Sequence, residues 1–546
     1  MKKSWRILAT LLFAAALLIG GSLGDDLVAM NDEMQIRVQQ YTDLIQVAKA
    51  RYGKDVTFRD LVYASIHGML RGLDPHTSFL SREAYAQMRE RQQSSFYGLG
   101  IWVGMRNGQL TVITPIPGTP AHQMGMRSGD IISKIDGEPT DSMDVDDAIS
   151  KLKGPKDTTV VVTLVRPGLD EPLDLEVTRA EIPQNTVRHA YMIAPGTGYL
   201  SIFDFSRSTG GEVARGLEKL RQAGMERLIL DLRGNGGGLL DQAIEVADQF
   251  VPENSTIVET RGRIRSSFSK LTSSGTYREL GLPLIVLVNG GSASASEILA
   301  GAIQDHDVGL IVGEPTWGKG LVQTVYNLQH GDAGLAITTA RYYTPSGRLI
   351  QRDYASYWDY YTSYDSHTSV ADLEQKNGEH VYYTDLGRKV YGGGGIIPDV
   401  QVDPKEIDQL LVRLNARSAI FTYSLEWAND HPVADTSWQP PEEMIQGFRT
   451  WIVDQGYADA DEAARAFADP EVATYVRNRM RYEIFNSLFG LEEGHQALSE
   501  IDEQIQKAFA LFDEATALLD QRHGLAADQR IAAARAEDPG AQPDAR

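Results

Sequence analysis

The fold is decided by the stretch LIVLVNGGSASASE, residues 284–297 of the 546-residue chain. Its five leading apolar residues predict a buried strand, and the glycines and small residues after them predict a tight turn. A helix is expected from Ala295 to Ile303. This order is typical of an α/β protein, and it places serines beside a helix N-terminus, where negative charge is stabilised.

The same order occurs upstream. Residues 228–232 (LILDL) predict a second buried strand, RGNGGG at 233–238 a glycine-rich turn, and residues 239–250 an amphipathic helix. A further strand is expected at 308–312. We therefore expect an α/β core over residues 183–402, with strand-to-helix turns that gather backbone N–H groups along one edge.

A second glycine-rich turn, GKGLVQ at 318–323, holds a lysine among apolar residues. A serine hydroxyl is a poor nucleophile until a base takes its proton. Lysine can be that base only if desolvation lowers its pKa well below about 10.4. No carboxylate adjoins Lys319, and Gln323 lies on the same face, where a neutral amide can orient the amine. The pattern predicts a serine protease without histidine, in which any of the three serines of the first turn is a candidate nucleophile.

Residues 95–182 differ in character and resemble a PDZ domain of the bacterial protease type. Strands are expected around residues 110–113 and 158–165, and helices from Pro120 and over 145–152. The loop Gly98-Leu99-Gly100-Ile101 is expected to converge its N–H groups on a peptide's terminal carboxylate while the peptide adds as a strand.

Composition and the N-terminus bound the function. The chain has no cysteine, which excludes disulfides and thiol catalysis, and its net charge of −22 argues against nucleic-acid binding. Lys2, Lys3 and Arg6 precede an apolar run at 7–20. Residues 1–24 are thus expected to be a signal peptide or a short membrane anchor, so that the protein is exported to the periplasm or cell envelope, with an inner-membrane tether as the alternative.

The flanking regions show no catalytic pattern. We expect helical regions at 34–93 and 404–523, including helical apolar spacing over 497–519, and a disordered tail at 524–546. A tyrosine-rich insert occupies 353–391 and could line the cleft, cover it, or pack. These regions leave open whether the chain forms homo-oligomers and whether it binds an adaptor or regulatory protein.

Together these motifs resemble the carboxyl-terminal processing, or tail-specific, protease family. The resemblance covers most of residues 35–402 and rests also on LDPHTS at 73–78, YTPSGR at 343–348 and GIIPDV at 395–400. It implies a multidomain α/β protein, with a crotonase- or Clp-protease-like α/β protease core, an inserted PDZ domain and flanking helical regions. It implies no metal or organic cofactor, and protein substrates with apolar C-terminal tails.

The resemblance also assigns roles. It makes the middle serine, Ser294, the nucleophile and Lys319 the base, at the family's 25-residue spacing (319 − 294), with Gln323 in support. Asp305 is expected to give structural support, and Arg166 is a candidate switch residue of the PDZ domain.

An oxyanion hole is then expected from the backbone N–H groups of Ala295 and Gly237, each worth roughly 3 kcal/mol. A tight turn would also explain the glycine run. Two alternative functions are a PDZ scaffold whose core only binds peptides and a crotonase-like acyl-CoA enzyme. The serine and lysine oppose the first, and the export signal and PDZ module oppose the second. The adjacent residues Asp305 and His306 could be read as part of a Ser-His-Asp catalytic triad, but such a pair at a helix end is usually a surface pair.

Overall fold

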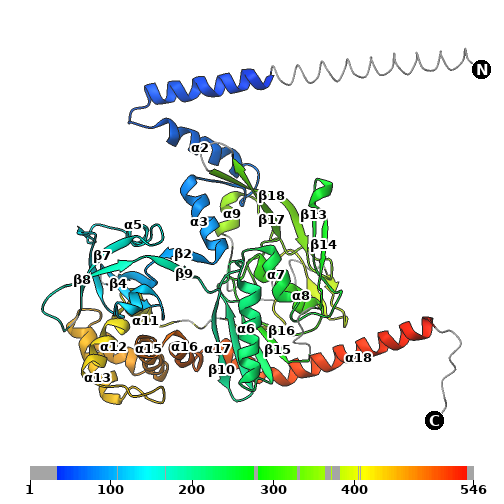
Figure 1. Cartoon of the computed structure of the whole chain (residues 1–546). Helices are drawn as coiled ribbons and strands as arrows, with labels where there is room; N and C mark the ends of the chain where they lie inside the picture. Colours follow the sequence, from blue (N-terminus) through cyan, green and yellow to red (C-terminus); the bar gives the residue numbers. More distant parts are fainter. Residues whose placement is uncertain are drawn as a thin grey trace, which may run out of the picture. The chain divides into compact units, whose positions relative to one another are not determined.

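The computed structural model describes residues 33–106, 108–166, 168–275, 281–328, 333–362, 364, 371, 381–403, 405 and 407–537 (Figure 1). The expected signal peptide or anchor at 1–24 lies outside these residues. None of the helices within the described ranges has both the length and the hydrophobicity to cross a membrane.

The core is a six-stranded sheet in the order β10-β11-β12-β15-β16-β21. Only the β10–β11 pair is antiparallel among these neighbours. The strands are β10 (Val187–Ala194), β11 (Thr197–Ile202), β12 (Arg227–Asp231), β15 (Leu284–Val288), β16 (Leu310–Gly313) and β21 (Val400–Gln401). The strands expected at 228–232, 284–288 and 308–312 correspond to β12, β15 and β16, and they lie next to one another.

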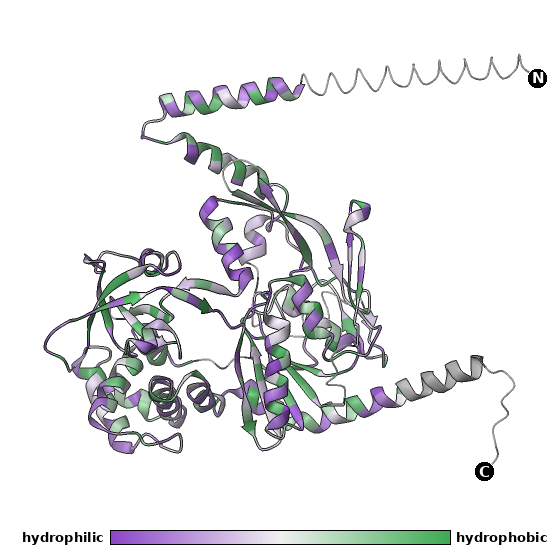
Figure 2. Ribbon diagram, in the orientation of Figure 1, coloured by the Kyte–Doolittle hydropathy of each residue, from purple (hydrophilic) through white to green (hydrophobic). Residues whose placement is uncertain are grey.

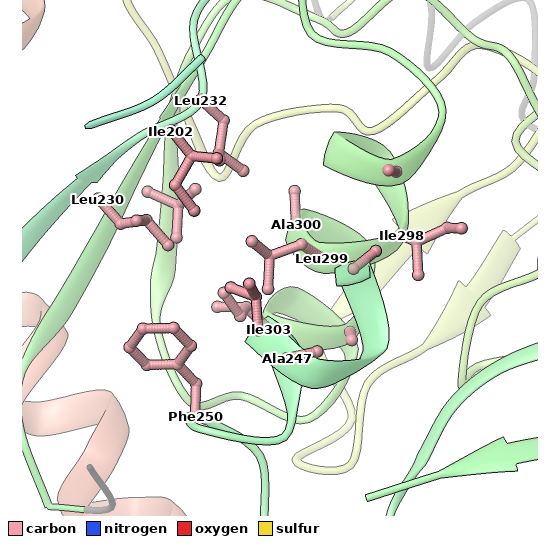
Figure 3. Packing of buried hydrophobic residues seen from close by; sticks show 14 of the residues in the cluster. Ile202, Leu230, Leu232, Ala247, Phe250, Ile298, Leu299, Ala300 and Ile303 are labelled. Carbon is pink, nitrogen blue, oxygen red and sulfur yellow. The ribbon is translucent and has the colours of Figure 1, made fainter. Parts of the chain in front are cut away.

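Helices cover the first face of this sheet. Leu228, Leu230, Val286 and Val288 alternate along β12 and β15 and pack in one buried cluster with residues of the helices. Figure 3 shows Leu230 and Phe250 of this cluster facing Leu299 and Ile303 of α8. The helices are α6 (Thr209–Gln222), α7 (Leu240–Ala247) and α8 (Ala295–Asp305).

The end of the chain covers the second face. Ile229, Ile285 and Leu287 point to this side and form a buried cluster with Ile505 and Phe512. The helical stretch expected at 497–519 is three helices: the end of α16 (Leu491–Ser499), α17 (Glu503–Ala510) and the start of α18 (Phe512–Glu537). The last residues of the expected C-terminal helical region are therefore part of the protease core.

The expectation of a disordered tail from Gly524 is wrong up to Glu537, because α18 continues to that residue. The segment 525–536 is rich in alanine, the residue with the strongest helix propensity. The composition that suggested disorder also suits a helix.

The remaining C-terminal helices form a bundle with its own core. Leu414, Phe448, Val476 and Met480 are fully buried in it. The helices are α11 (Gln409–Ala416), α12 (Ala419–Asp430), α13 (Glu442–Asp454), α14 (Ala460–Phe467) and α15 (Pro470–Leu488).

Residues 95–183 form a separate β-rich module. Its main sheet has the order β3-β4-β5-β7-β8, with β6 beside β5, around a core that includes Val112, Ile132 and Val162. The strands are β3 (Ile101–Arg106), β4 (Gln109–Pro115), β5 (Ile131–Ile135), β6 (Glu138–Pro139), β7 (Thr159–Val165) and β8 (Leu173–Thr178), and the helices are α4 (Pro120–Gln123) and α5 (Val145–Leu152). β2 (Ser95–Gly98) pairs with β9 (Ala180–Pro183) and joins the two ends of the module. The expected helices and strands of the PDZ-like region are confirmed.

A second small sheet completes the core. β13 (Thr256–Gly262) pairs with β14 (Ser269–Thr272) and with the end of β18 (Ala333–Tyr343). β17 (Leu321–Leu328), which carries Gln323, also pairs with β18.

The helix α3 (Arg82–Gln93) has no fully buried residue and is mostly hydrophilic in Figure 2.

The N-terminal unit comprises the described residues up to Leu80 together with 325–328 and 333–337. Residues 33–51 are helical, and α2 (Phe58–Arg71) starts at a capping box of Thr57 and Asp60. β1 (Ser78–Leu80) pairs with the part of β18 in this unit. Large apolar side chains on the helices are exposed, among them Met34, Ile36, Leu44, Val47 and Met69.

Candidate active site

The nucleophile turn has a strained backbone at one serine. Ser294 has φ +56° and ψ −111°, a conformation that L-residues seldom adopt, and it caps the N-terminus of α8. Ser292 donates its hydroxyl to Leu232 O at 2.8 Å, and Ser296 donates to Asn235 O at 2.8 Å. Both flanking serines therefore hold the turn against the neighbouring loop, which leaves Ser294 as the candidate nucleophile.

Glu297 joins this turn to the lysine turn. Its side chain is fully buried and accepts four hydrogen bonds. The donors are Ser294 N at 2.7 Å, Thr316 Oγ1 at 2.6 Å, Gly318 N at 2.7 Å and Lys319 N at 2.9 Å. Burial raises the pKa of Glu297, and these donors oppose the rise because they favour the carboxylate. One carboxylate thus fixes the backbone of both Ser294 and Lys319.

Tyr342 on β18 makes a second connection between the turns. Its hydroxyl lies 3.1 Å from Ser294 O and also contacts Lys319 O, while its backbone N–H donates to Gly320 O at 3.0 Å. Burial raises the pKa of Tyr342, which keeps the phenol protonated as a donor. Neither Glu297 nor Tyr342 was assigned a role from the sequence. A glutamate three residues after a helix-capping serine is a capping-box signal, whereas nothing in the sequence marks Tyr342.

The environment of Lys319 disfavours the charged form of its amine. Nζ donates to Gln323 Oε1 at 3.0 Å. Burial lowers the pKa of Lys319, and the nearby Glu297 opposes this only in part. Ser294 Oγ and Lys319 Nζ, both within the described chain, are not hydrogen-bonded to each other in this structure. The expected Lys319–Gln323 hydrogen bond is present.

The glycine loop lies against the nucleophile. Gly237 has φ +98°, and a Cβ there would lie 2.8 Å from both Ser294 Cβ and Ala295 N, so a side chain would collide with the turn. Its N–H, however, donates to Asn235 Oδ1 at 2.9 Å. Ala295 is the first residue of α8, as expected for an oxyanion donor. Gly237 is therefore placed at the expected position, but its N–H is engaged by Asn235.

Asp305 supports a neighbouring turn. Its carboxylate binds Arg348 Nη2 at 2.8 Å and accepts from Ser346 N at 3.0 Å, and the side chains of Asp305 and Arg348 are fully buried. His306 contacts Asp385 Oδ2 at 2.9 Å and Thr256 O at 2.7 Å. These contacts account for Asp305 and His306 without a catalytic triad. No cluster of acidic and histidine side chains suited to a metal occurs in the described parts of the chain.

The tyrosine-rich insert packs beside the lysine turn. Trp317 Nε1 donates to Tyr360 OH at 2.8 Å, and Tyr364 OH donates to Pro315 O at 3.0 Å. The Arg352 guanidinium lies over the rings of Trp317 and Tyr360, 4.4 and 4.8 Å from their centroids. Residues 363, 365–370 and 372–380 of the insert lie outside the described residues.

The PDZ loop contains a glycine in the left-handed region of backbone conformation. Gly100 has φ +82°, and a Cβ there would lie 2.3 Å from Thr119 Cβ. Leu99 is buried, and the loop leads into β3, which is at the edge of its sheet. Gly98 and Ile101 are the last residue of β2 and the first of β3. An edge strand after such a loop can pair with an added peptide strand.

Arg166 is held within the PDZ module. Its guanidinium binds Asp130 at 2.7 and 2.8 Å and donates to Gly125 O at 2.8 Å. The Asp130 hydrogen bond raises the pKa of Arg166. The hydrogen bonds of Arg166 are therefore all to the PDZ module, and none is to Ser294 or Lys319.

Comparison with known proteins agrees with the two modules. Residues 196–355 match peptidase family S41, and residues 111–166 match the PDZ domain. The chain is 38% identical over 330 residues to a carboxy-terminal-processing protease of Bartonella bacilliformis, covering 59% of this chain and 75% of the relative. It is 34% identical over 373 residues to a carboxyl-terminal-processing protease of Synechocystis, covering 64% and 86%. A solved photosystem II D1 C-terminal processing protease is 31% identical, covers 66% of this chain and 86% of that one, and gives a TM-score of 0.34.

Replacing Glu297 by glutamine should weaken the connection between the two turns. The amide nitrogen of Gln would face N–H donors, and each buried donor left without an acceptor costs about 1–3 kcal/mol. We expect kcat/KM of Glu297→Gln to fall at least about tenfold, or about 1.4 kcal/mol of transition-state stabilisation, in a peptide-cleavage assay. Glu218→Gln, on the exposed side of α6, is the control and should match wild type. Wild-type kcat/KM in Glu297→Gln would contradict the role given to this carboxylate.

Proposed function

Because the chain belongs to the carboxy-terminal processing proteases of peptidase family S41, we propose that it is an exported endopeptidase that recognises substrate C-terminal tails through its PDZ domain and cleaves them with a Ser294–Lys319 dyad. The observation that carries the dyad is the environment of Lys319. A buried amine with a lowered pKa is held by a neutral amide, and its turn is fixed to that of Ser294 by Glu297.

Each residue then has one task in the reaction. Ser294 Oγ attacks the scissile carbonyl carbon while Lys319 Nζ, as the free amine, takes the hydroxyl proton. The resulting ammonium gives this proton to the leaving amine, so that an acyl-enzyme remains on Ser294. Water, deprotonated by the same amine, then releases the acyl group. Gln323 orients Nζ for both steps and, being neutral, places no opposite charge beside the ammonium.

The developing oxyanion needs two donors. The Ala295 N–H is at the start of α8, where the helix dipole adds to its field. The Gly237 N–H becomes the second donor when it turns from Asn235 Oδ1 towards Ser294. Formation of the Ser294–Lys319 hydrogen bond requires a movement as well. We infer that the described arrangement is a resting one and that substrate binding completes the site.

The PDZ module supplies substrate recognition in this proposal. A tail would add as a strand to β3, with its terminal carboxylate at the N–H groups of residues 98–101. We propose apolar tails, because two of the four loop residues, Leu99 and Ile101, are apolar. Arg166 would act as a switch only by leaving Asp130, which it binds through two hydrogen bonds.

The remaining proposals concern location and assembly. The basic residues and the apolar run at 7–20 support export to the periplasm or envelope, with or without a tether at the inner membrane. The exposed apolar side chains of the N-terminal helices support a protein contact, either with another copy of the chain or with an adaptor.

The dyad is tested by substitution. We expect Ser294→Ala and Lys319→Ala each to lower kcat by about ten-thousandfold or more on a protein substrate with an apolar tail, because neither residue alone can form the acyl-enzyme. Ser267→Ala and Lys270→Ala are matched controls: they alter another serine and lysine, three residues apart, whose lysine is exposed. Cleavage at the wild-type rate by either dyad variant would rule out the assignment.

Tail recognition is tested with one substrate in two forms, with a free C-terminal carboxylate and with a C-terminal amide. The amide should raise KM about tenfold because it removes one charge-assisted contact to the loop. Gly100→Ala should abolish the difference, since a Cβ there meets Thr119. Gly137→Ala is the control, because Gly137 also has a positive φ in the PDZ module but has open space at its Cβ. Equal KM values for both substrate forms in wild type would contradict tail recognition.

A further inference from the structure

Arg233, the first residue of the glycine loop, is bound from two sides. Asp231, two residues before it, accepts from Arg233 Nη2 at 2.6 Å and from Nε at 3.0 Å. From the far end of the chain, Asp502 lies 2.8 Å from Nη1 and Gln504 Oε1 accepts from the same nitrogen at 3.1 Å. The side chain of Arg233 thus joins β12 to α17.

These contacts are formed away from bulk water. The side chain of Arg233 is 18% exposed, that of Asp231 is 8% exposed and that of Asp502 is 28% exposed. Burial would raise the pKa of Asp231, but the guanidinium that faces it holds this pKa below its usual range. Tyr199 OH adds a hydrogen bond to Asp231 at 2.7 Å. Charge-assisted hydrogen bonds with this degree of burial fix the direction of a guanidinium closely.

The loop that follows Arg233 lies against the nucleophile turn. Gly234 N donates to Asn289 Oδ1 at 2.9 Å, and Asn235 O accepts from Ala293 N at 3.0 Å and from Ser296 Oγ at 2.8 Å. Gly237 then meets Ser294. Four of the six residues of the loop 233–238 are glycine, so side-chain anchors are available only at Arg233 and Asn235.

α17 is itself held against the sheet. Asp502 caps its N-terminus by accepting from Ile505 N at 3.1 Å, so the carboxylate that holds Arg233 also starts the helix. The preceding helix, α16, is fixed to β10 by two contacts of His495. Its Nδ1 lies 2.8 Å from the hydroxyl of Tyr191, and its ring stacks on that of His189 with 4.2 Å between the ring centroids. The break between α16 and α17 therefore has a defined position.

We propose that α17 is part of the catalytic apparatus: Asp502 and Gln504 are positioning residues that hold Arg233 and, through it, the glycine loop beside Ser294. This inference rests on the proposed Ser294–Lys319 protease, because its effect on rate is exerted on that site. It gives the C-terminal helices a function that their sequence does not suggest. Asp502 touches neither substrate nor reacting atoms and acts on the loop through Arg233.

The test replaces Asp502 by asparagine, which removes the charge but remains a good N-cap residue. We expect kcat of Asp502→Asn to fall about tenfold with KM within about twofold of wild type, since the loop acts in the transition state. Hydrogen exchange of the amides at 231–238 should become faster in this variant. Glu503→Gln is the matched control: Glu503 is the next residue of the same helix, its side chain is 52% exposed, and it faces Lys405.

The outcomes separate this proposal from the assignment of the dyad. Cleavage by wild type but not by Ser294→Ala would support the dyad. If Asp502→Asn then equals Glu503→Gln in both kcat and the exchange of the loop amides, the positioning role of Asp502 is wrong. If wild type fails to cleave, the proposed function fails, and loop exchange alone decides whether Asp502 holds the loop. If Asp502→Asn does not fold, Gln504→Leu, which leaves the cap intact, must show the faster exchange. Unchanged exchange in that variant overturns the proposal.

Discussion

The site depends on one buried carboxylate, that of Glu297. Placing a carboxylate in the interior is unfavourable unless hydrogen bonds replace its hydration. Here the compensation comes from the two turns that carry the reaction: one backbone N–H from the nucleophile turn, two from the lysine turn, and the hydroxyl of Thr316. The same contacts that make the charge tolerable therefore fix the relative position of the Ser294 and Lys319 backbones. Tyr342 reinforces them by lying against the carbonyl groups of both residues.

The parallel sheet explains why such distant segments meet. β12, β15 and β16 are parallel neighbours, so their carboxyl ends lie at one edge. The segment after β12 is the glycine loop, the segment after β15 is the nucleophile turn, and the segment after β16 leads to Lys319. Successive side chains along each strand point to opposite faces of the sheet, and both faces are buried. Helices α6 to α8 cover one face, and α17 and α18 cover the other. Because α17 covers the second face, its first residues reach Arg233 at the same edge.

Local patterns in the sequence were sufficient for much of this. The apolar run at 284–288, the glycines and the helix that follows predicted β15, the turn and α8, and the PDZ elements followed from the same rules. The Lys319–Gln323 contact was predictable because residues four positions apart point to the same side of an extended segment or of a helix. The partners of Glu297, the role of Tyr342 and the contact from Asp502 to Arg233 were not predictable, because they join segments far apart in the chain. The break at Asp502 was missed because apolar spacing continues across it. The length of α18 was missed because alanine-rich composition suits both helix and disorder.

The pKa of the Lys319 amine tests this account most directly. It can be measured by NMR with isotope-labelled lysine, and Lys319→Ala identifies the resonance. We expect a titration well below the ordinary value of about 10.4, since burial disfavours the ammonium and Gln323 is neutral. A Lys319 amine that titrates at or above the ordinary value would be charged during catalysis, and it would contradict the assignment of this residue as the base.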